Sequence, residues 1–185
     1  MACLATFTVF FTRTGINSMM IPFYADGAIG LNKTSIGTVL SYATLTNLAL
    51  TVPFSYAIDY FGRKPMIVRS LAVTALSAII FPMTSDYYQI SLATVLLGIG
   101  TSGAGQAPPA LATDGTIEEP HGLSMGLYRL FGDIGFVVGP ILLGIMADGY
   151  GLRMPFYFMA GMILINAVLL TAFAKETYSV KRRKE

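Results

Sequence analysis

The sequence predicts an all-α membrane protein whose six transmembrane helices form a 3+3 inverted repeat. Composition is the first observation: 54% of the 185 residues are hydrophobic and only 12% are charged, against about 25% charged in an ordinary soluble domain. The apolar residues also gather into runs long enough to cross a bilayer core, which takes roughly 20 residues per helix. A repeat within the chain is the third observation. The low charge content argues against a soluble enzyme, and the apolar excess excludes a disordered chain and a collagen-like chain.

Six apolar segments account for the predicted helices. Their ranges are 4–24, 36–58, 66–83, 90–112, 123–147 and 155–174. Each is between 18 and 25 residues long, which is the usual length of a spanning helix. Glycine and proline inside them do not argue against helix, because neighbouring membrane helices satisfy the freed backbone groups. No segment alternates between apolar and polar residues as the strands of a membrane barrel do.

The first segment is expected to remain as a span, since no basic residues precede it and Arg13 interrupts it, unlike a secretory signal. Arg13 lies mid-span, and Asn17 follows one turn later on the same face. A charge at mid-bilayer is costly and usually faces a polar cavity or a partner. We therefore interpret Arg13 as a site for an anionic group or for a carboxylate of another bundle. The alternative is a helix that begins later, with Arg13 snorkelling toward the interface.

The second and fourth segments carry uncharged polar candidates. A polar stripe at helical spacing runs along the second segment, and its members are Thr44, Asn47, Thr51 and Ser55. We expect this stripe to line a polar pathway, although it could instead bond a neighbouring helix. In the fourth segment, prolines at 108 and 109 predict a bend, because proline removes a backbone donor and clashes with the preceding turn. Gln106 beside that bend could then contact substrate.

The fifth segment holds a charged pair. Arg129 and Asp133 are four residues apart, so they share a helix face and can neutralise each other. They form either a gate or proton-linked pair in a transport pathway, or a structural pair that locks a closed state. Asp133 is the candidate for a protonatable carboxylate.

Short polar stretches separate the segments, and their charges predict the orientation. These stretches are 26–35, 59–65, 84–88, 114–122 and 148–154. With six spans, both termini share one side with the second and fourth stretches. That side carries eight basic residues against two on the other: Arg63, Lys64, Arg69, Lys175, Lys181, Arg182, Arg183 and Lys184 against Lys33 and Arg153. The positive-inside rule therefore predicts a multi-pass protein with both termini in the cytoplasm, and we expect it in the plasma (cytoplasmic) membrane.

The repeat has an offset of 89 residues. The tripeptide at 35–37 recurs at 124–126 (124 − 35 = 89), and the pattern of 59–64 recurs at 148–153 (148 − 59 = 89). Three spans per copy is an odd number, so the two copies must lie in opposite orientations in the membrane. We expect one bundle over 1–175, divided into repeats of about 1–86 and 87–175, followed by a basic cytoplasmic tail at 176–185.

Two motifs resemble those of the major facilitator superfamily. Residues 59–65, Asp-Tyr-Phe-Gly-Arg-Lys-Pro, resemble the family's D-R-x-G-R-[KR] signature between helices 2 and 3, with Tyr60 in place of the first arginine. Residues 135–144 resemble the G-x-x-x-G-P-x-x-x-G antiporter motif of helix 5, through Gly135, Gly139, Pro140 and Gly144. Helix 4 lacks an arginine that N-terminal halves of proton-coupled antiporters usually carry. With the basic tail, this favours a C-terminal half.

The resemblance implies one six-helix half of a secondary transporter, with a small-molecule substrate bound between two halves. The second half could belong to the same transporter, to a separate chain or to another copy, and a fragment is the favoured interpretation. The helix 5 motif implies proton-coupled efflux of a drug-like or metabolite substrate. The alternative is a non-transporting membrane subunit or an inactive fragment. The sequence gives no reason to expect an enzyme, a cofactor, a metal site or nucleic-acid binding, and its one cysteine excludes a multi-cysteine metal site.

The resemblance also implies a cytoplasmic latch formed by Asp59, Gly62, Arg63, Lys64 and Asp114. In the family, the residue at the position of Asp59 caps a helix of the other half, and the position of Arg63 pairs with that of Asp114. Gly62 allows the tight reversal between the second and third helices. A plainer interpretation is that the basic residues only fix the topology. The glycines of the helix 5 motif have a plain interpretation too, which is close helix packing.

Overall fold

The computed structural model describes residues 7–8, 10–104 and 121–173, which are almost entirely helical and contain no strand. The N-terminal helix, at 7–8 and 10–29, includes η1 (Arg13–Met20), α2 (Ile21–Tyr24) and η2 (Ala25–Ile29), of which the first and last are π-helical. The other elements are α3 (Lys33–Phe61), α4 (Arg63–Ile80), the 3-10 turn η3 (Phe81–Met83), α5 (Tyr87–Ala104), α7 (His121–Tyr150) and α8 (Met154–Phe173).

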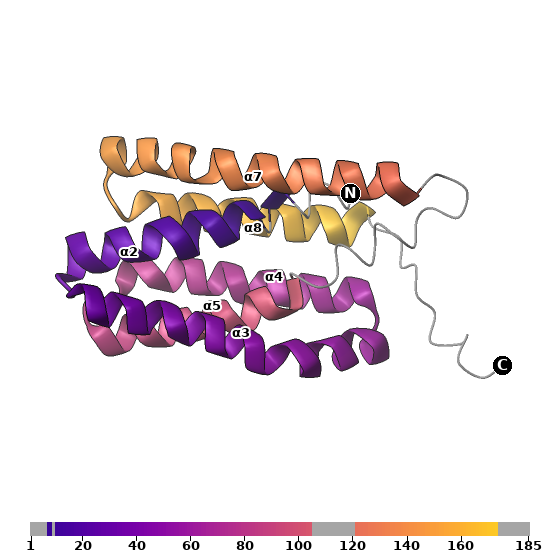
Figure 1. Cartoon of the computed structure of the whole chain (residues 1–185), viewed down its shortest axis with the longest axis horizontal. Coiled ribbons are helices and arrows are strands. Elements are labelled where there is room, and N and C mark those ends of the chain that lie inside the picture. Colours follow the sequence, from indigo (N-terminus) through magenta and orange to yellow (C-terminus); the bar gives the residue numbers. More distant parts are fainter. Residues whose placement is uncertain (1–6, 9, 105–120, 174–185) are drawn as a thin grey trace.

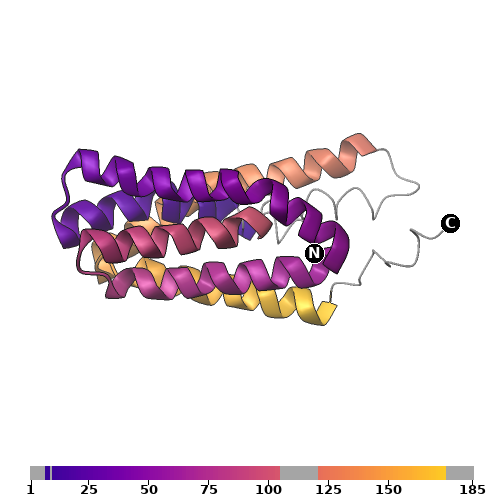
Figure 2. The same ribbon diagram turned by 90° about the horizontal axis from the view of Figure 1, so that it is seen from below.

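The helices lie side by side along one long axis, and the chain reverses at each end (Figure 1). The connections at 30–32, 84–86 and 151–153 lie at one end, and the turn at Gly62 lies at the other (Figures 1 and 2). We call these the Lys33 end and the Gly62 end, respectively. The four candidate cations Lys33, Arg153, Arg63 and Lys64 therefore separate into two pairs at opposite ends.

The helices are longer than the lengths predicted from the apolar segments, and the connections between them are correspondingly shorter. The expected stretch 59–65 was too long, because α3 ends at Phe61 and α4 begins at Arg63, so Gly62 alone joins them. Arg63 and Lys64 consequently lie in the first turn of α4. Gly62 has φ +92° and its N–H donates to the Ile58 carbonyl oxygen at 3.0 Å, a backbone conformation that favours glycine.

The expected stretch 26–35 was also too long. The N-terminal helix continues to Ile29 and α3 begins at Lys33. Asn32 caps α3, since its side-chain oxygen accepts a hydrogen bond from the Ser35 N–H at 2.8 Å. A cap of this kind satisfies a backbone donor outside the apolar segment, so the helix can begin several residues before its apolar part.

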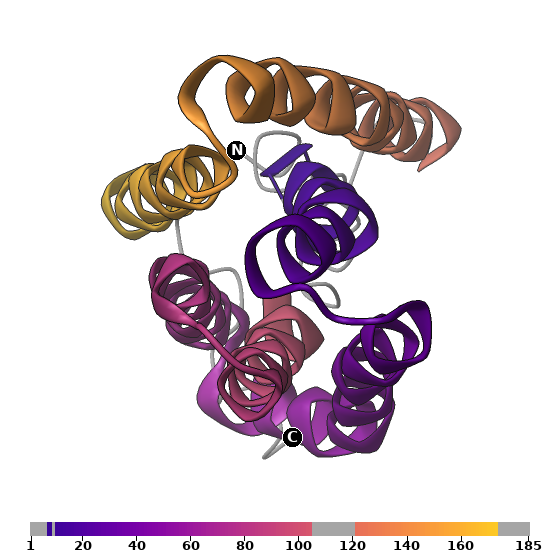
Figure 3. The ribbon, with the colours of Figure 1, turned by 90° about the vertical axis from the view of Figure 1, so that its left-hand side faces the viewer.

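The packing order is visible down the long axis (Figure 3). α4 packs against both α5 and α8, α3 packs on α5, and α7 packs on the N-terminal helix. One buried cluster, with Phe11, Phe81 and Phe156 among its members, joins the N-terminal helix to its neighbours. A second cluster, with Leu71 and Ile163 among its members, fills the contact of α4 with α8.

An aromatic group fixes the N-terminal helix at the Lys33 end. The Tyr24 hydroxyl lies 3.0 Å from the Thr84 carbonyl oxygen and 3.2 Å from that of Pro82. Phe156 of α8 lies between two rings, stacked on Phe81 with centroids 5.2 Å apart and edge-on to Tyr24 at 5.4 Å. The start of α8 and the end of α4 are thereby joined to the first helix.

Four of the described helices are long and apolar enough to cross a membrane. They are Lys33–Ile58, Lys64–Met83, Arg129–Tyr150 and Met154–Ala172, and they correspond to the second, third, fifth and sixth predicted segments. The first and fourth predicted segments, 4–24 and 90–112, extend partly outside the described residues.

Candidate functional site

The N-terminal helix carries its two polar candidates on a π-helical stretch. Arg13 opens η1 and is exposed, and Asn17 lies one turn later and is half-buried. The Asn17 side-chain oxygen is buried and has no hydrogen-bond partner among the described residues. A buried amide oxygen without a partner is uncommon, and π-helical turns occur often at functional sites. These two residues remain the candidates that the sequence pointed to.

The polar side chains of the α3 stripe form hydrogen bonds within α3 and to the neighbouring helix α5. The Asn47 side-chain nitrogen lies 3.3 Å from the Thr101 hydroxyl of α5. The Thr51 hydroxyl donates to the Asn47 carbonyl oxygen at 2.7 Å, and the Thr44 hydroxyl donates to that of Leu40 at 3.3 Å. Asn47 therefore lies at the contact between α3 and α5, whereas Thr44 is exposed.

The charged pair of α7 shares a face. The Arg129 Nε atom lies 3.9 Å from the Asp133 Oδ2 atom, and the two side chains are 82% and 64% exposed. That distance is too long for a hydrogen bond, so the pair is a loose one on the surface of this bundle. Nothing in the described residues buries Asp133, and its environment in a larger assembly depends on what covers α7.

The latch residues are described only in part. The backbone of Asp59 and Arg63 is described but their side chains are not, and Asp114 and Gln106 lie outside the described residues. Gly62 is buried at the turn between α3 and α4, and Lys64 is half-buried in the first turn of α4.

The glycines of the motif at 135–144 lie where α7 crosses the N-terminal helix. A Cβ atom added to Gly135 would lie 2.7 Å from the Phe7 carbonyl oxygen. One added to Gly139 would lie 3.2 Å from the Phe11 carbonyl oxygen, and one added to Gly144 would lie 3.0 Å from a flexible methionine side chain. Pro140 is half-buried inside α7. The motif thus brings two backbones close together.

Sequence reasoning missed a hydroxyl cluster at the Lys33 end. The Tyr87 hydroxyl at the start of α5 lies 3.0 Å from the Thr38 hydroxyl and 3.3 Å from the Tyr42 hydroxyl of α3. The hydrogen bond with Thr38, and then that with Tyr42, lowers the pKa of the Tyr87 phenol, which precedes the predicted span 90–112. Nothing in the sequence indicated this pairing, since the residues are more than 40 positions apart.

Sequence reasoning also missed two buried interhelical bonds. The Ser77 hydroxyl of α4 donates to the Ala93 carbonyl oxygen of α5 at 2.8 Å. The Asn166 side-chain nitrogen of α8 lies 2.5 Å from the Thr8 hydroxyl of the N-terminal helix. The offset of 89 residues could have drawn attention to these two donors, because Asn166 follows Ser77 by that number (166 − 77 = 89).

The part of the chain that the structure describes contains no group of three or more His, Cys, Asp and Glu side chains that could hold a metal ion. Its charged and polar candidates are spread over α3, α7 and the N-terminal helix. This arrangement is suited to lining a surface between bundles and offers no compact constellation for acid–base or nucleophilic chemistry.

Comparison with known proteins identifies what the whole chain is similar to. A sequence model described as Major Facilitator Superfamily matches residues 2–185. The match covers both the signature at 59–65 and the glycine motif at 135–144.

The curated relatives are longer than this chain. Multidrug resistance protein 2 of Bacillus subtilis is 28% identical over 183 residues, which are 98% of this chain and 45% of the relative. Multidrug resistance protein MdtG of Enterobacter lignolyticus is 31% identical over 172 residues, or 89% of this chain and 40% of the relative. An uncharacterized MFS-type transporter of Methanocaldococcus jannaschii is 27% identical over 184 residues, or 96% and 46%. The chain thus spans about half the length of the curated relatives it matches.

Proposed function

The chain belongs to the major facilitator superfamily, and we propose that it forms one six-helix half of a secondary transporter that moves a small solute by alternating access. The observation that carries this proposal is the match of the family over 2–185, in a chain that spans about half of its transporter relatives. The family and the four long apolar helices make it an integral membrane protein.

We propose further that the half is a 3+3 inverted repeat, divided near residue 87. Exchanging the first helix with the fourth, the second with the fifth and the third with the sixth maps three sets of helix contacts onto one another. α3 packs on α5 as α7 packs on the N-terminal helix, α4 packs on α5 as α8 packs on the N-terminal helix, and the contact of α4 with α8 maps onto itself. A repeat of this kind predicts such an exchange.

Two crossings support the repeat at the level of residues. A Cβ atom added to Gly98 of α5 would lie 2.9 Å from the Thr46 Cβ atom of α3, and one added to Gly135 of α7 would lie 3.2 Å from the Phe11 backbone nitrogen. Gly135 follows Thr46 by 89 residues (135 − 46), and the position equivalent to Gly98 is residue 9 (98 − 89), which lies between Phe7 and Phe11. Ser77 and Asn166, which are also 89 apart, both donate to the neighbouring helix.

The second half would cover the outer faces of α3 and α7. α7 exposes several large apolar side chains along its length: Phe136, Val137, Ile141 and Ile145. Contiguous apolar surface of this kind marks either a lipid-facing or a protein-facing region in a membrane protein. The presence of Arg129 and Asp133 on the same helix favours protein, because an exposed ion pair facing lipid tails is costly.

In this arrangement the pathway residues are Arg13, Asn17 and Asn47 together with Arg129 and Asp133. Arg13 would attract an anionic group of the substrate or a carboxylate of the second half. The unpartnered Asn17 oxygen would accept a hydrogen bond there. Gln106 follows Asn17 by 89 residues (106 − 17), so we propose that it offers an equivalent amide from the fourth helix.

The named relatives suggest the substrate class. Two of them are multidrug resistance proteins, so we propose efflux of drug-like compounds, with Asp133 as the proton-carrying carboxylate.

We propose that the Gly62 end faces the cytoplasm and carries the latch. The reversal at Gly62 sets Arg63 and Lys64 in the first turn of α4, at the end to which the positive-inside rule assigns the basic residues. Arg63 would pair with Asp114, and Asp59 would meet a helix N-terminus of the second half, where a carboxylate is stabilised.

Crosslinking in membranes tests whether a second bundle covers α7. With Cys3→Ala as background, Ile141→Cys places a thiol on α7 and Ile165→Cys places one on α8, at side chains that are 60% and 63% exposed. We expect a short reagent that attaches to the Ile141→Cys thiol and carries a photoreactive group, which needs no thiol on its target, to join α7 to a second bundle. That bundle is the other half of the same transporter, a separate chain or another copy. Ile165→Cys is the matched control and should crosslink far less. Equal crosslinking at both positions, or none at Ile141→Cys, would contradict the proposal.

Dye efflux from cells that hold the assembled transporter tests the role of Asp133. We expect Asp133→Asn to abolish efflux driven by a proton gradient, because the amide cannot carry a proton. Asp148→Asn changes an exposed carboxylate near the Lys33 end of the same helix and should leave efflux unchanged. Unaltered proton-driven efflux by Asp133→Asn would contradict the assignment.

A further inference from the structure

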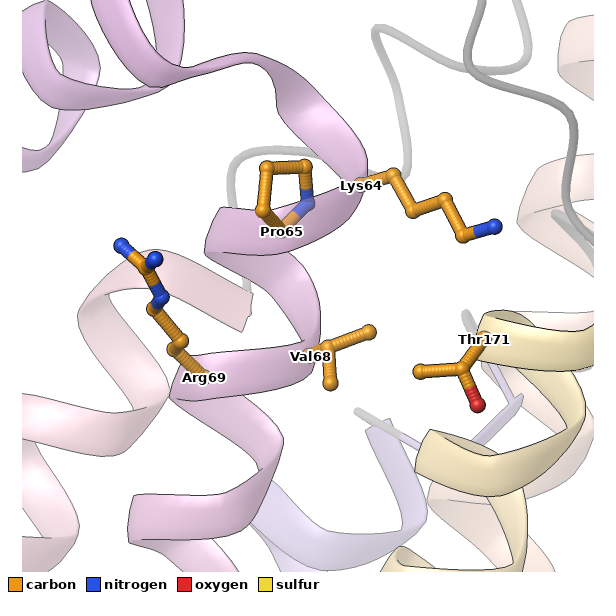
Figure 4. A pocket seen from close by; sticks show the side chains of 5 residues that line it. All are labelled: Lys64, Pro65, Val68, Arg69 and Thr171. Atoms are coloured by element: carbon orange, nitrogen blue, oxygen red, sulfur yellow. The ribbon is translucent and has the colours of Figure 1, made fainter.

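A pocket of about 460 Å³ lies between α4 and α8 at the Gly62 end. It is lined by Lys64, Pro65, Val68, Arg69 and Thr171. Val68 and Thr171 approach each other from the two helices, Lys64 extends toward the gap between them, and Arg69 points to the opposite side of α4, away from Thr171 (Figure 4). Two of the five lining side chains are cations and none is an anion.

Neither cation has a carboxylate partner in the ranges 7–8, 10–104 and 121–173, where the one ion pair joins Arg129 to Asp133. Arg69 is exposed and Lys64 is half-buried. Arg69 lies five residues inside the apolar stretch Lys64–Met83, or about 7.5 Å along the helix axis. A guanidinium at that depth reaches the headgroup level by snorkelling, and it favours an anion there.

The surface beside the pocket is apolar. Beyond Arg69, the outer face of α4 exposes Leu76 and Ile79, and beyond Thr171 the outer face of α8 exposes Val168 and Leu164. Both stripes lie within stretches that are long and apolar enough to cross a membrane. The pocket, with its two cations at the end of the bundle, therefore lies next to exposed apolar side chains at hydrocarbon depth.

We propose that this pocket binds the headgroup phosphate of an anionic phospholipid, whose acyl chains lie along the outer faces of α4 and α8. The two cations match the phosphate charge, and the exposed apolar side chains beside the pocket match the acyl chains. That apolar surface favours a bilayer lipid over a free phosphate ester, which would gain nothing from it. Basic pockets between membrane helices are suited to such headgroups. The site shares Lys64 with the proposed latch, but it lies apart from the surface proposed for the second half, which is on α3 and α7.

Quenching of a single tryptophan by lipids with brominated chains tests this proposal. The chain has no tryptophan, so Val168→Trp reports only on lipid beside the pocket. Tyr157→Trp is the matched control: both side chains are exposed, and 11 residues bring them to the same face of α8, about 16 Å apart and in opposite leaflets. The full chain is reconstituted in mixed vesicles of phosphatidylglycerol and phosphatidylcholine, with one or the other brominated.

We expect phosphatidylglycerol to be preferred about fivefold at Val168→Trp, the effect of roughly one basic residue at a membrane surface, and to show no preference at Tyr157→Trp. The double change Lys64→Gln with Arg69→Gln should abolish the preference. Lys33→Gln with Arg153→Gln, which removes the same charge from the Lys33 end, should keep it. If the Lys64/Arg69 double variant does not reconstitute, the difference in lipid preference between Val168→Trp and Tyr157→Trp still tests whether the preference is local to the pocket.

Three results would overturn the proposal. One is an equal preference at both tryptophan positions, which would reflect general attraction to the protein's charge. Another is a preference that survives the loss of Lys64 and Arg69. The third is removal of the preference by millimolar glycerol 3-phosphate, which would show that the pocket takes a free phosphate ester and has no need of the lipid's chains.

Discussion

The contact between α4 and α8 differs from the outer helices α3 and α7 in how its stability is built. In the most apolar stretches of α4 and α8, 56% and 44% of the residues are buried, against 11% and 22% in α3 and α7. Bulky side chains such as Leu71, Ile163 and Leu170 fill the α4–α8 contact. α3 and α7 are attached along one narrow face each, and the rest of their surface is exposed.

The attachments of α3 and α7 depend on glycine. A Cβ atom at Gly98 would lie 2.8 Å from the Ala43 carbonyl oxygen, and one at Gly135 would lie 2.7 Å from that of Phe7. In a membrane, lipid tails are as apolar as leucine, so close backbone approach and van der Waals contact hold helices together. The α4–α8 contact is therefore held together by the volume of its side chains, whereas α3 and α7 are held by the close backbone approach that glycine permits.

The largest expected effect comes from adding a methyl group at the glycine crossings. Gly98→Ala and Gly135→Ala should each lower the free energy of unfolding by about 2–3 kcal/mol, because the new Cβ atom would meet a backbone carbonyl that cannot rotate away. Denaturation of the chain in mixed micelles, followed by circular dichroism, measures this loss.

The control variants should change the free energy of unfolding in the opposite direction. Gly37 on α3 and Gly161 on α8 have no neighbouring atom within 4 Å of an added Cβ atom. Gly37→Ala and Gly161→Ala should therefore stabilise the chain by about 0.5 kcal/mol through helix propensity alone. If alanine at Gly98 and Gly135 behaved like alanine at Gly37, the proposed mode of attachment of α3 and α7 would be wrong.

A smaller effect is expected where the contact depends on side-chain volume. Ile163 of α8 is fully buried, and Ile141 of α7 is 60% exposed. Ile163→Ala should lower the free energy of unfolding by about 2 kcal/mol, at the low end for buried aliphatic residues, because lipid is no more polar than the core and only the cavity contributes. Ile141→Ala should change it by less than about 0.5 kcal/mol. Equal losses at the two positions would remove the distinction between the α4–α8 contact and α7.

The four long helices were predictable from the sequence because each contains an apolar run that is long enough to cross a membrane. The four long apolar helices confirm the second, third, fifth and sixth predicted segments. Their ends were not predictable from hydropathy, since a side-chain cap at Asn32 and a positive φ at Gly62 decide where α3 begins and ends. Neither the cap at Asn32 nor the positive φ at Gly62 affects the hydropathy pattern from which the helices were predicted.

The candidate site was predictable only as a set of residue types. Spacing placed Arg129 and Asp133 on one face, and the structure brings them within 3.9 Å. The direction of the Asn47 side chain could not be read from the sequence, because a pathway and a neighbouring helix both satisfy an amide, and here Thr101 of α5 provides the partner. The sequence offset of 89 residues also relates Ser77 to Asn166, a relation that the prediction from the sequence did not use.

The smallest expected effect compares the two equivalent interhelical hydrogen bonds. Ser77 and Asn166 both donate from a buried side chain to the helix that begins the other proposed repeat, Ser77 from α4 to α5 and Asn166 from α8 to the N-terminal helix. Hydrogen bonds between membrane helices contribute about 0.6 kcal/mol on average. Ser77→Ala and Asn166→Ala should therefore destabilise the chain by similar amounts, near that value, in the same micelle assay. Ser41→Ala is the control, because the exposed Ser41 hydroxyl donates within its own helix, to the Gly37 carbonyl oxygen at 2.8 Å, and its loss should be close to neutral. A marked difference between Ser77→Ala and Asn166→Ala would mean that the two repeats share a packing order without sharing its energetics.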